Sequence, residues 1–224
     1  ITVEIPRNTL TVITGLSDQD FLFRSVPSDA FQGVALAQVV AEQGYKNIAT
    51  LYVNNDYGEG LADSFKKAFK NKRGRVSQSL PYEPGNASYR GELSKAASGG
   101  ARALLLIGYP ENGVTILRQA LEEGFFSEFV YTDGLKAPEI IDAIGAKYLN
   151  GSFGTAPQAL TDTPAAKRYL TAYKKEYGEV PPKPFIDTSY DATFMLALAA
   201  EKAGRTNARA IRDALRDVSN PPGE

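Results

Sequence analysis

The sequence predicts an α/β fold built on a parallel sheet, and two observations support that prediction. Strand-like apolar runs alternate with helix-like amphipathic runs between residues 32 and 156, in the order typical of a parallel sheet covered by helices on both faces. The composition agrees, because 43% hydrophobic and 23% charged residues in a chain of 224 are ordinary values for a globular protein.

The alternating region defines most of the expected elements. A helix expected from about Gly60 places Leu61, Phe65 and Phe69 at four-residue spacing on one face, which we expect to be buried. A helix expected at 114–123 is followed by Gly124, a common C-cap residue, so it should end there. The expected strands are 48–53, 75–80, 103–107, 129–132 and 151–156, and the other expected helices are 32–42, 88–97 and 138–144.

From about residue 164 the sequence predicts helices and no strands. These helices are expected at 165–178, 187–204 and 207–218. Tyr169, Tyr173 and Tyr177 recur every four residues and predict one packing stripe. The helices need a sheet to cover their apolar faces, but the only other strand-like run is the short segment 10–13. We therefore expect the chain to lack part of its N-terminal region.

Charge and residue types exclude several functions. The formal net charge is −1 with both signs mixed along the chain, so neither nucleic acid nor an anionic membrane is an expected partner. The chain has no Cys and no His, which excludes Ser-His-Asp and Cys-His catalysis and removes the commonest zinc ligand. We expect no cofactor and no metal. No stretch approaches the roughly 18 apolar residues of a membrane-spanning helix, and a signal peptide is absent from the chain as given.

Three expected loops follow strands and carry acids or tyrosines; they are 54–60, 108–113 and 132–138. Ligands of parallel sheets bind at the carboxyl ends of the strands, so these loops should lie along one rim. Their acids and tyrosines are Asp56, Tyr57, Glu59, Tyr109, Glu111 and Asp133. Carboxylates flanked by aromatic faces favour a small cation such as an ammonium group, through charge-assisted hydrogen bonds and cation–π attraction.

Two other interpretations of these loops stay open. Gly58 and Gly60 match the start of a dinucleotide-binding pattern, but Asp63 stands where its third glycine belongs, and nearby acids would repel a pyrophosphate. The second interpretation is structural, because Asp133 followed by Gly134 is also a common turn and a tyrosine at a strand end is often a packing residue.

The ordered set of segments closely resembles the branched-chain amino-acid (leucine/isoleucine/valine) binding proteins of bacterial ABC importers. The similarity extends from Phe21 to Pro222 and is carried by FLFRSVPSDAFQGVALAQVV, LYVNNDYGEGLADSFKKAFK, LLLIGYPENGVTILRQALEEG, YTDGLKAPEIIDAIG, AAKRYLTAYKKEYGE, SYDATFMLALAAEKAG and AIRDAL. The resemblance implies a type I periplasmic binding protein fold, with two doubly wound parallel-sheet lobes joined by a hinge and one lobe largely incomplete here. It divides the chain into a remnant of the first lobe (1–29), a ligand-binding second lobe (30–156) and helices of the first lobe (157–224).

The resemblance also implies a function and a site. It implies an extracytoplasmic, periplasmic solute-binding protein that holds a branched-chain or similar amino acid, has no catalytic activity, is monomeric and delivers its ligand to a membrane permease. Tyr57, Tyr109 and Asp133 match the family's second-lobe contacts, and Asp133 stands where relatives often have a glutamate that receives the ligand's α-amino group. The serine- and threonine-rich loop with which relatives grip the ligand carboxylate has no counterpart after Ile13.

Two alternatives remain at the level of the sequence. One is a ligand-sensing receptor or regulatory domain of the same fold. Such a domain transmits the conformational change of closure and does not deliver its ligand to a permease. The other is an enzyme of flavodoxin-like fold that uses only Asp, Glu, Lys or Tyr. That enzyme would need a carboxylate pair with a bound metal, whereas the acids of this rim are spread over separate loops.

Overall fold

The structure is a computed structural model that describes residues 9–158 and 160–219. The chain divides into two compact units, each described here by itself. We call residues 10–14 and 28–156 the sheet unit. The helical unit comprises residues 1–9, 15–27 and 157–224, of which the described residues are 9, 15–27, 157–158 and 160–219.

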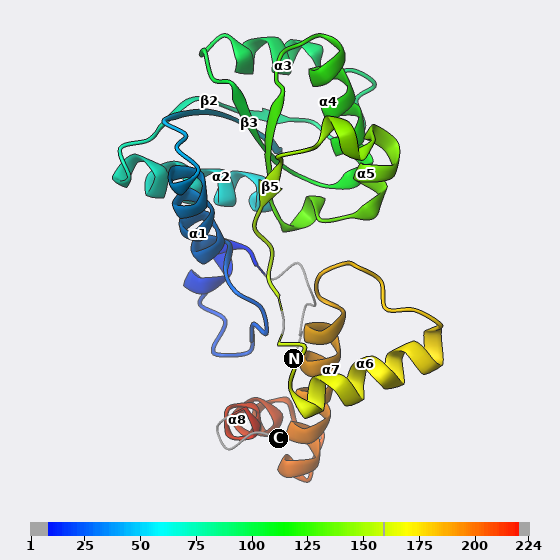
Figure 1. The fold of residues 1–224 in the computed structure, drawn as a ribbon. Coiled ribbons are helices and arrows are strands. Elements are labelled where there is room, and N and C mark those ends of the chain that lie inside the picture. Colours follow the sequence, from blue (N-terminus) through cyan, green and yellow to red (C-terminus); the bar gives the residue numbers. More distant parts are fainter. Residues whose placement is uncertain (1–8, 159, 220–224) are drawn as a thin grey trace. The chain divides into compact units, whose positions relative to one another are not determined.

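The sheet unit is built on one parallel sheet, which confirms the predicted α/β class (Figure 1). Its strand order is β2-β1-β3-β4-β5, and every neighbouring pair is parallel. The strands are β1 (Asn47–Val53), β2 (Arg75–Tyr82), β3 (Ala103–Ile107), β4 (Glu128–Tyr131) and β5 (Phe153–Gly154).

Helices cover both faces of this sheet. The helices are α1 (Asp29–Glu42), α2 (Asp56–Asn71), α3 (Arg90–Ala97), α4 (Pro110–Glu122) and α5 (Pro138–Ile144). Figure 1 shows α1 and α2 on one side of the sheet and α3 and α4 on the other. The winding reverses between β1 and β3, because α2 leads from β1 toward one edge and α4 leads from β3 toward the other. Ligands of doubly wound sheets bind at such a switch point.

The core of the sheet unit lies on both sides of β3, where all five residues are buried. The predicted apolar face of α2 is confirmed, since Leu61, Phe65 and Phe69 are fully buried. The rings of Phe65 and Phe69 stack with centroids 5.2 Å apart. Full burial of one such side chain stabilises a fold by about 1.5–3 kcal/mol.

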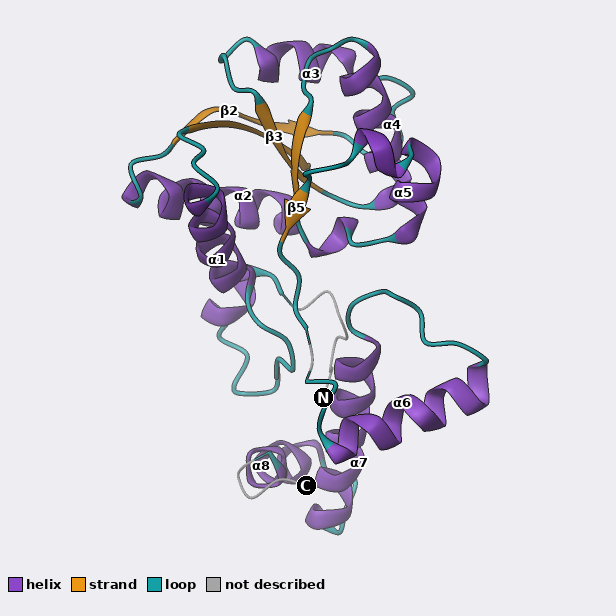
Figure 2. Ribbon diagram, in the orientation of Figure 1, coloured by secondary structure: helices purple, strands orange, loops and turns teal. Residues whose placement is uncertain are grey.

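The helical unit contains α6 (Pro164–Tyr177), α7 (Ile186–Ala203) and α8 (Ala208–Val218), which confirms the three predicted helices. Figure 2 shows only helices and loops in its described part. Its buried cluster consists of Ala199 on α7 with Ala214 and Leu215 on α8. Within the described residues, no helix has the length and apolar content that a membrane crossing requires.

The strand expected at residues 10–13 is wrong. A 3-10 helix, Thr11–Gly15, occupies this segment, and most of it belongs to the sheet unit. No described strand pairs with the segment, so its backbone groups bond locally instead, as in the 3.4 Å bond from Ile13 N to Leu10 O. The segment packs against α2, since a Cβ added at Gly60 would lie 2.6 Å from Thr11 Oγ1.

Helices α2 and α4 both begin about one turn earlier than predicted. Helix α2 begins at Asp56, because the Asn55 side chain caps it by accepting a 2.9 Å hydrogen bond from Gly58 N. Helix α4 begins at Pro110, whose ring suits the first helical turn. Most of the expected loops 54–60 and 108–113 are therefore first turns of helices. The strand expected at 151–156 is shorter and includes only Phe153–Gly154.

Candidate functional site

Tyr57, Tyr109 and Asp133 meet at the carboxyl edge of the sheet. Tyr57 lies in the first turn of α2, Tyr109 is the N-cap residue of α4, and Asp133 follows β4 in a short 3-10 turn. Strands β1, β3 and β4 are parallel neighbours, with Tyr52 of β1 paired to Ile107 at the end of β3. Their ends are therefore brought together at the point where the winding of the sheet reverses.

The two tyrosine rings form one side of this site. Tyr57 and Tyr109 stack with ring centroids 5.5 Å apart and an interplanar angle of 25°. Tyr57 is buried, with 6% of its surface exposed, and Tyr109 is half-buried. Gly134 permits the close approach of the third loop, because a Cβ there would lie 2.4 Å from Gly108 O and 3.2 Å from the Tyr57 hydroxyl.

The Asp133 carboxylate is held by hydrogen bonds in a nearly closed environment. Its exposed fraction is 5%. The Tyr57 hydroxyl donates to Asp133 Oδ1 over 3.0 Å and lies 2.9 Å from Thr132 Oγ1. Because the single Tyr57 proton goes to Asp133, the Thr132 hydroxyl is the donor in the second bond. Tyr57 of α2 thus fixes one carboxylate oxygen, and Thr132, which directly follows β4, holds the Tyr57 hydroxyl in place.

Burial dominates the protonation of this site. It raises the pKa of Asp133, an effect that hydrogen bonds from Gln32 and Tyr57 partly offset. Burial also raises the pKa of Tyr57 well above its usual value, and the neighbouring Asp133 charge raises it further. Tyr57 therefore remains a proton donor at neutral pH. None of the ion pairs among residues 9–158 and 160–219 involves Asp133.

Gln32 belongs to the same polar cluster and is absent from the residues predicted from the sequence. It lies on α1 with only 6% of its surface exposed, and its Nε2 donates to Thr155 O over 2.9 Å. Its side chain also lowers the pKa of the Asp133 carboxyl, against the larger effect of burial. A signal was present, because Gln32 shares four-residue spacing with the fully buried Leu36 and Val40. A polar residue in an apolar stripe requires a buried partner.

The other predicted rim acids do not join the site. Asp56, Glu59 and Glu111 are exposed, so the predicted acidic rim reduces to the buried carboxylate of Asp133 and its tyrosines. Gly58, the first glycine of the weak dinucleotide pattern, has a packing role, because a Cβ at this position would lie 2.0 Å from Val53 O. The described residues contain no group of three or more acids that could hold a metal ion.

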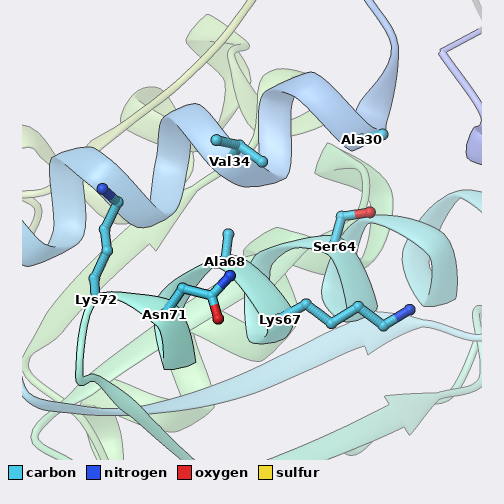
Figure 3. A pocket seen from close by; sticks show the side chains of 7 residues that line it. All are labelled: Ala30, Val34, Ser64, Lys67, Ala68, Asn71 and Lys72. Carbon is cyan, nitrogen blue, oxygen red and sulfur yellow. The ribbon is translucent and has the colours of Figure 1, made fainter.

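One concave surface of the sheet unit lies apart from this site. It is a groove of about 450 Å³ between α1 and α2, lined by Ala30, Val34, Ser64, Lys67, Ala68, Asn71 and Lys72 (Figure 3). None of Tyr57, Tyr109 and Asp133 lines it. Its Lys67 is exposed and lies on the side of α2 that faces away from the sheet core, so we do not include the groove in the candidate site.

Polar and aromatic side chains at the switch point of a doubly wound sheet are typical of small-molecule-binding α/β proteins. A family described as "Periplasmic binding protein" matches residues 4–221. The chain therefore belongs to the periplasmic binding protein family, as the resemblance implied.

Individual relatives agree with this membership. The chain is 30% identical over 198 residues to a leucine-, isoleucine-, valine-, threonine- and alanine-binding protein of Pseudomonas aeruginosa, covering 87% of this chain and 52% of that protein. It is 28% identical over 214 residues to a chemotactic signal transduction system substrate-binding protein, BasB, of Halobacterium salinarum, covering 93% of this chain and 49% of that protein. The chain thus spans about half the length of these curated relatives.

A solved structure supports the fold. The crystal structure of a leucine-binding protein, LivK, from Thermotoga maritima matches with a TM-score of 0.82 and 29% identity. The match covers 92% of this chain and 59% of that one. The type I periplasmic binding protein fold expected from the sequence is confirmed for the region that the two chains share.

Proposed function

We propose that this chain is part of an extracytoplasmic solute-binding protein that binds a branched-chain or similar amino acid for an ABC importer. Membership of the periplasmic binding protein family supports a binding role in the periplasm, without catalysis. The amino-acid ligands named for the Pseudomonas aeruginosa relative support the ligand class. The partner of such a protein would be a membrane permease.

The observation that carries this proposal is the environment of Asp133. A buried carboxylate is costly to ionise unless a cation or several donors compensate it. Asp133 accepts a hydrogen bond from Tyr57 but takes part in none of the ion pairs of the described chain. An α-ammonium group would supply the missing positive charge through a charge-assisted hydrogen bond.

The tyrosines have distinct roles in this proposal. Tyr57 orients the carboxylate through its hydroxyl, while its ring is held against Tyr109. Tyr109 is half-buried, so its ring can contact the ligand and attract the ammonium group by a cation–π interaction. We also propose the division expected from the family, in which residues 30–156 form the ligand-binding second lobe, while 1–29 and 157–224 belong to the first.

The experiment that tests the proposal replaces Asp133. Asp133→Asn keeps the shape of the side chain but would leave the ligand ammonium facing a neutral amide. Removing one partner of a buried charged pair typically costs about 2–5 kcal/mol, so we expect the dissociation constant for leucine, isoleucine or valine to rise well over tenfold. Calorimetric titration of the protein at its full natural length measures the change.

Glu111→Gln is the matched control, because Glu111 is an exposed acid in the first turn of α4, which follows the neighbouring strand β3. It should retain wild-type affinity. Wild-type affinity in Asp133→Asn would remove Asp133 from the site, and tight binding of sugars or nucleotides without any amino acid would overturn the ligand class.

Similarity to the chemotactic BasB protein favours a second candidate function, in which the chain senses an amino acid instead of feeding a permease. Deleting the gene distinguishes the two candidates. Loss of labelled leucine uptake indicates transport, whereas loss of a response to leucine with normal uptake indicates sensing.

A further inference from the structure

We propose that Tyr82 is a positioning residue that sets the spacing of the Tyr57 and Tyr109 rings at the candidate site. The inference rests on the proposed function, in which the Tyr109 ring attracts the ligand's ammonium group. Tyr82 would not touch the ligand, and it would act through the two loops that follow β1 and β3. These loops are residues 54–55 and 108–109, which lead into α2 and α4.

The backbone of Tyr82 is bonded to the first of these loops. Tyr82 is the last residue of β2 and pairs with Val53 at the end of β1. Its carbonyl oxygen accepts a 2.9 Å hydrogen bond from Asn54 N. The next residue, Asn55, caps α2 through its side chain, and Tyr57 lies in the first turn of that helix. Tyr82 is therefore fixed relative to the start of α2.

The side chain of Tyr82 reaches the second loop. A Cβ added at Gly108 would lie only 1.9 Å from the Tyr82 hydroxyl oxygen, so this oxygen occupies the space where a side chain would begin. The strand register explains the contact. Tyr82 pairs with Val53 of β1, while Tyr52 of β1 pairs with Ile107, which directly precedes Gly108. Gly108 is thus two strands from Tyr82 along the same edge of the sheet, and its lack of a side chain admits the hydroxyl.

Gly108 links this contact to the rings of the site. A Cβ added at Gly134, in the loop that follows β4, would lie 2.4 Å from Gly108 O, 3.2 Å from the Tyr57 hydroxyl and 3.3 Å from Tyr109 Cδ1. The backbone of Gly108 is therefore in close contact with Tyr82 and with the third loop. Because Tyr109 is the next residue and the surroundings are close-packed, a shift of Gly108 would move the Tyr109 ring against Tyr57.

Burial holds the Tyr82 side chain in this position. The residue has 2% of its surface exposed, and its ring meets that of Tyr89 edge-on, with centroids 5.4 Å apart and an interplanar angle of 78°. Edge-to-face contact is a preferred arrangement of aromatic rings, so it favours one orientation of the Tyr82 ring. The hydroxyl consequently has little freedom to move away from Gly108.

A role in core packing alone makes a different prediction. In that case, loss of the Tyr82 hydroxyl would change stability and leave the rings and the ligand affinity unchanged. Tyr89 is the matched control, because it is the fully buried partner in the same ring pair. Its backbone N donates to Gln119 Oε1 over 2.7 Å, and the atoms nearest to a Cβ at Gly108 belong to Tyr82 and not to Tyr89.

The test compares Tyr82→Phe with Tyr89→Phe in the protein at its full natural length. Nuclear Overhauser contacts between the Tyr57 and Tyr109 rings are measured without ligand, and affinity for leucine is measured by calorimetry. Tyr82→Phe removes the atom against which Gly108 rests, so the ring contacts should change. Partial loss of a cation–π interaction should also weaken leucine binding by about three- to tenfold. Tyr89→Phe should keep the wild-type ring contacts and affinity.

Gly108→Ala tests the contact directly. Its Cβ would collide with the Tyr82 hydroxyl, so this variant should disturb the ring contacts and weaken leucine binding more than Tyr82→Phe does. Adding Tyr82→Phe removes the colliding oxygen and leaves Cζ 3.1 Å from the new Cβ. The double variant should therefore recover much of both properties, as expected for two residues in contact. Adding Tyr89→Phe to Gly108→Ala should give no recovery.

Two outcomes overturn the inference. One is that Tyr82→Phe keeps the wild-type contacts between the Tyr57 and Tyr109 rings, and the other is that it fails to relieve Gly108→Ala. The proposed function fails in a different way. If the ring contacts respond as expected while leucine binds none of the proteins, or binds all of them equally, Tyr82 positions the rings and the proposed role of Tyr109 in binding is wrong.

Discussion

The sheet unit and the helical unit bury similar sequence patterns to very different extents. On α2, Phe65 and Phe69 recur every four residues and are fully buried. On α6, Tyr173 and Tyr177 have the same spacing, yet Tyr177 is 69% exposed. Among the described residues, the core cluster of the sheet unit has thirty buried residues and that of the helical unit has three. Periodicity predicts a helix and its apolar face, but burial requires a second surface to cover that face.

The aromatic residues of the helical unit pack mainly against one another. Tyr169 on α6 lies with its ring centroid 4.8 Å from that of Tyr190 on α7, and Tyr190 stacks on Phe194 at 5.4 Å. Phe194 is 51% exposed. The tyrosines of the predicted stripe also contact one another, with ring centroids 5.8 Å apart for Tyr169 and Tyr173 and 4.7 Å apart for Tyr173 and Tyr177, but the stripe remains at the surface of the described unit. The described part of the unit has no strands that could cover it.

The largest effect is expected from a core substitution in the sheet unit. Phe65→Ala removes a fully buried ring and should lower the free energy of unfolding by about 3–5 kcal/mol. Phe194→Ala, the matched change on α7, should cost the sheet unit nothing and the helical unit less than about 1 kcal/mol. Hydrogen exchange of the β3 amides reports on the first unit, and that of the α7 amides on the second. Equal losses in the two units would contradict the comparison.

An intermediate effect is expected from glycines that serve different purposes in the two units. In the sheet unit, Gly134→Ala would place a Cβ 2.4 Å from Gly108 O, and such overpacking should cost about 1–3 kcal/mol. In the helical unit, Gly204 has open space around it but a φ of 60°, so Gly204→Ala should cost about 1 kcal/mol through backbone strain.

Asparagine separates these two causes, because it tolerates a left-handed backbone better than alanine does. Gly204→Asn should recover much of the stability lost in Gly204→Ala. Gly134→Asn should be at least as unstable as Gly134→Ala, since its side chain is larger. The stability of each unit in the four variants is measured by chemical denaturation, with hydrogen exchange of its amides as the readout. Recovery of stability by asparagine at both positions would show that Gly134 is not a packing residue.

The smallest effect is expected from pH, and its sign should differ between the units. Burial raises the pKa of Asp133, so its contribution to stability is present below the unfolded pKa and is lost as the pH rises through the folded pKa. The hydrogen bond with Arg216 lowers the pKa of Asp20 in the helical unit, so its contribution is present above the unfolded pKa and is lost as the pH falls through the folded pKa.

Each aspartate is compared with its own asparagine variant at pH 7 and at acidic pH, so that all other carboxyl groups cancel. Relative to Asp133→Asn, the wild-type sheet unit should gain stability on acidification. Relative to Asp20→Asn, the wild-type helical unit should lose stability on acidification, and added salt should weaken that difference because Asp20 and Arg216 are exposed. A change of the same sign in both units would mean that burial does not govern Asp133.

The fold of the sheet unit was largely predictable, because local patterns determine much of it. Alternation of apolar runs located the five strands, although β5 is shorter than expected. Helix starts were less predictable, since the Asn55 cap and Pro110 in the first turn extend α2 and α4 into segments that resemble glycine-containing loops. The strand predicted at residues 10–13 was wrong, because a strand depends on a partner strand that no local pattern can supply.

The candidate site was predictable only in part. Tyr57, Tyr109 and Asp133 each follow a strand, so the rule for parallel sheets placed them on one edge without any coordinates. Gln32 and Thr155 are 123 residues apart in the chain and form their hydrogen bond only in the folded unit. Such long-range contacts leave no periodic signal, apart from the unusual position of a glutamine in the apolar stripe of α1.

The sequence by itself determined the α/β class, the buried face of α2, the three helices of the helical unit and the strand ends that carry the site. Residue spacing within a segment and the succession of segments along the chain decide these features, and both are read directly from the sequence. The tertiary structure alone decided that Asp133 is buried while Asp56, Glu59 and Glu111 remain exposed. The reason is physical: desolvation depends on which distant segments cover a side chain, and it makes one carboxylate among several similar ones the chemically distinct group.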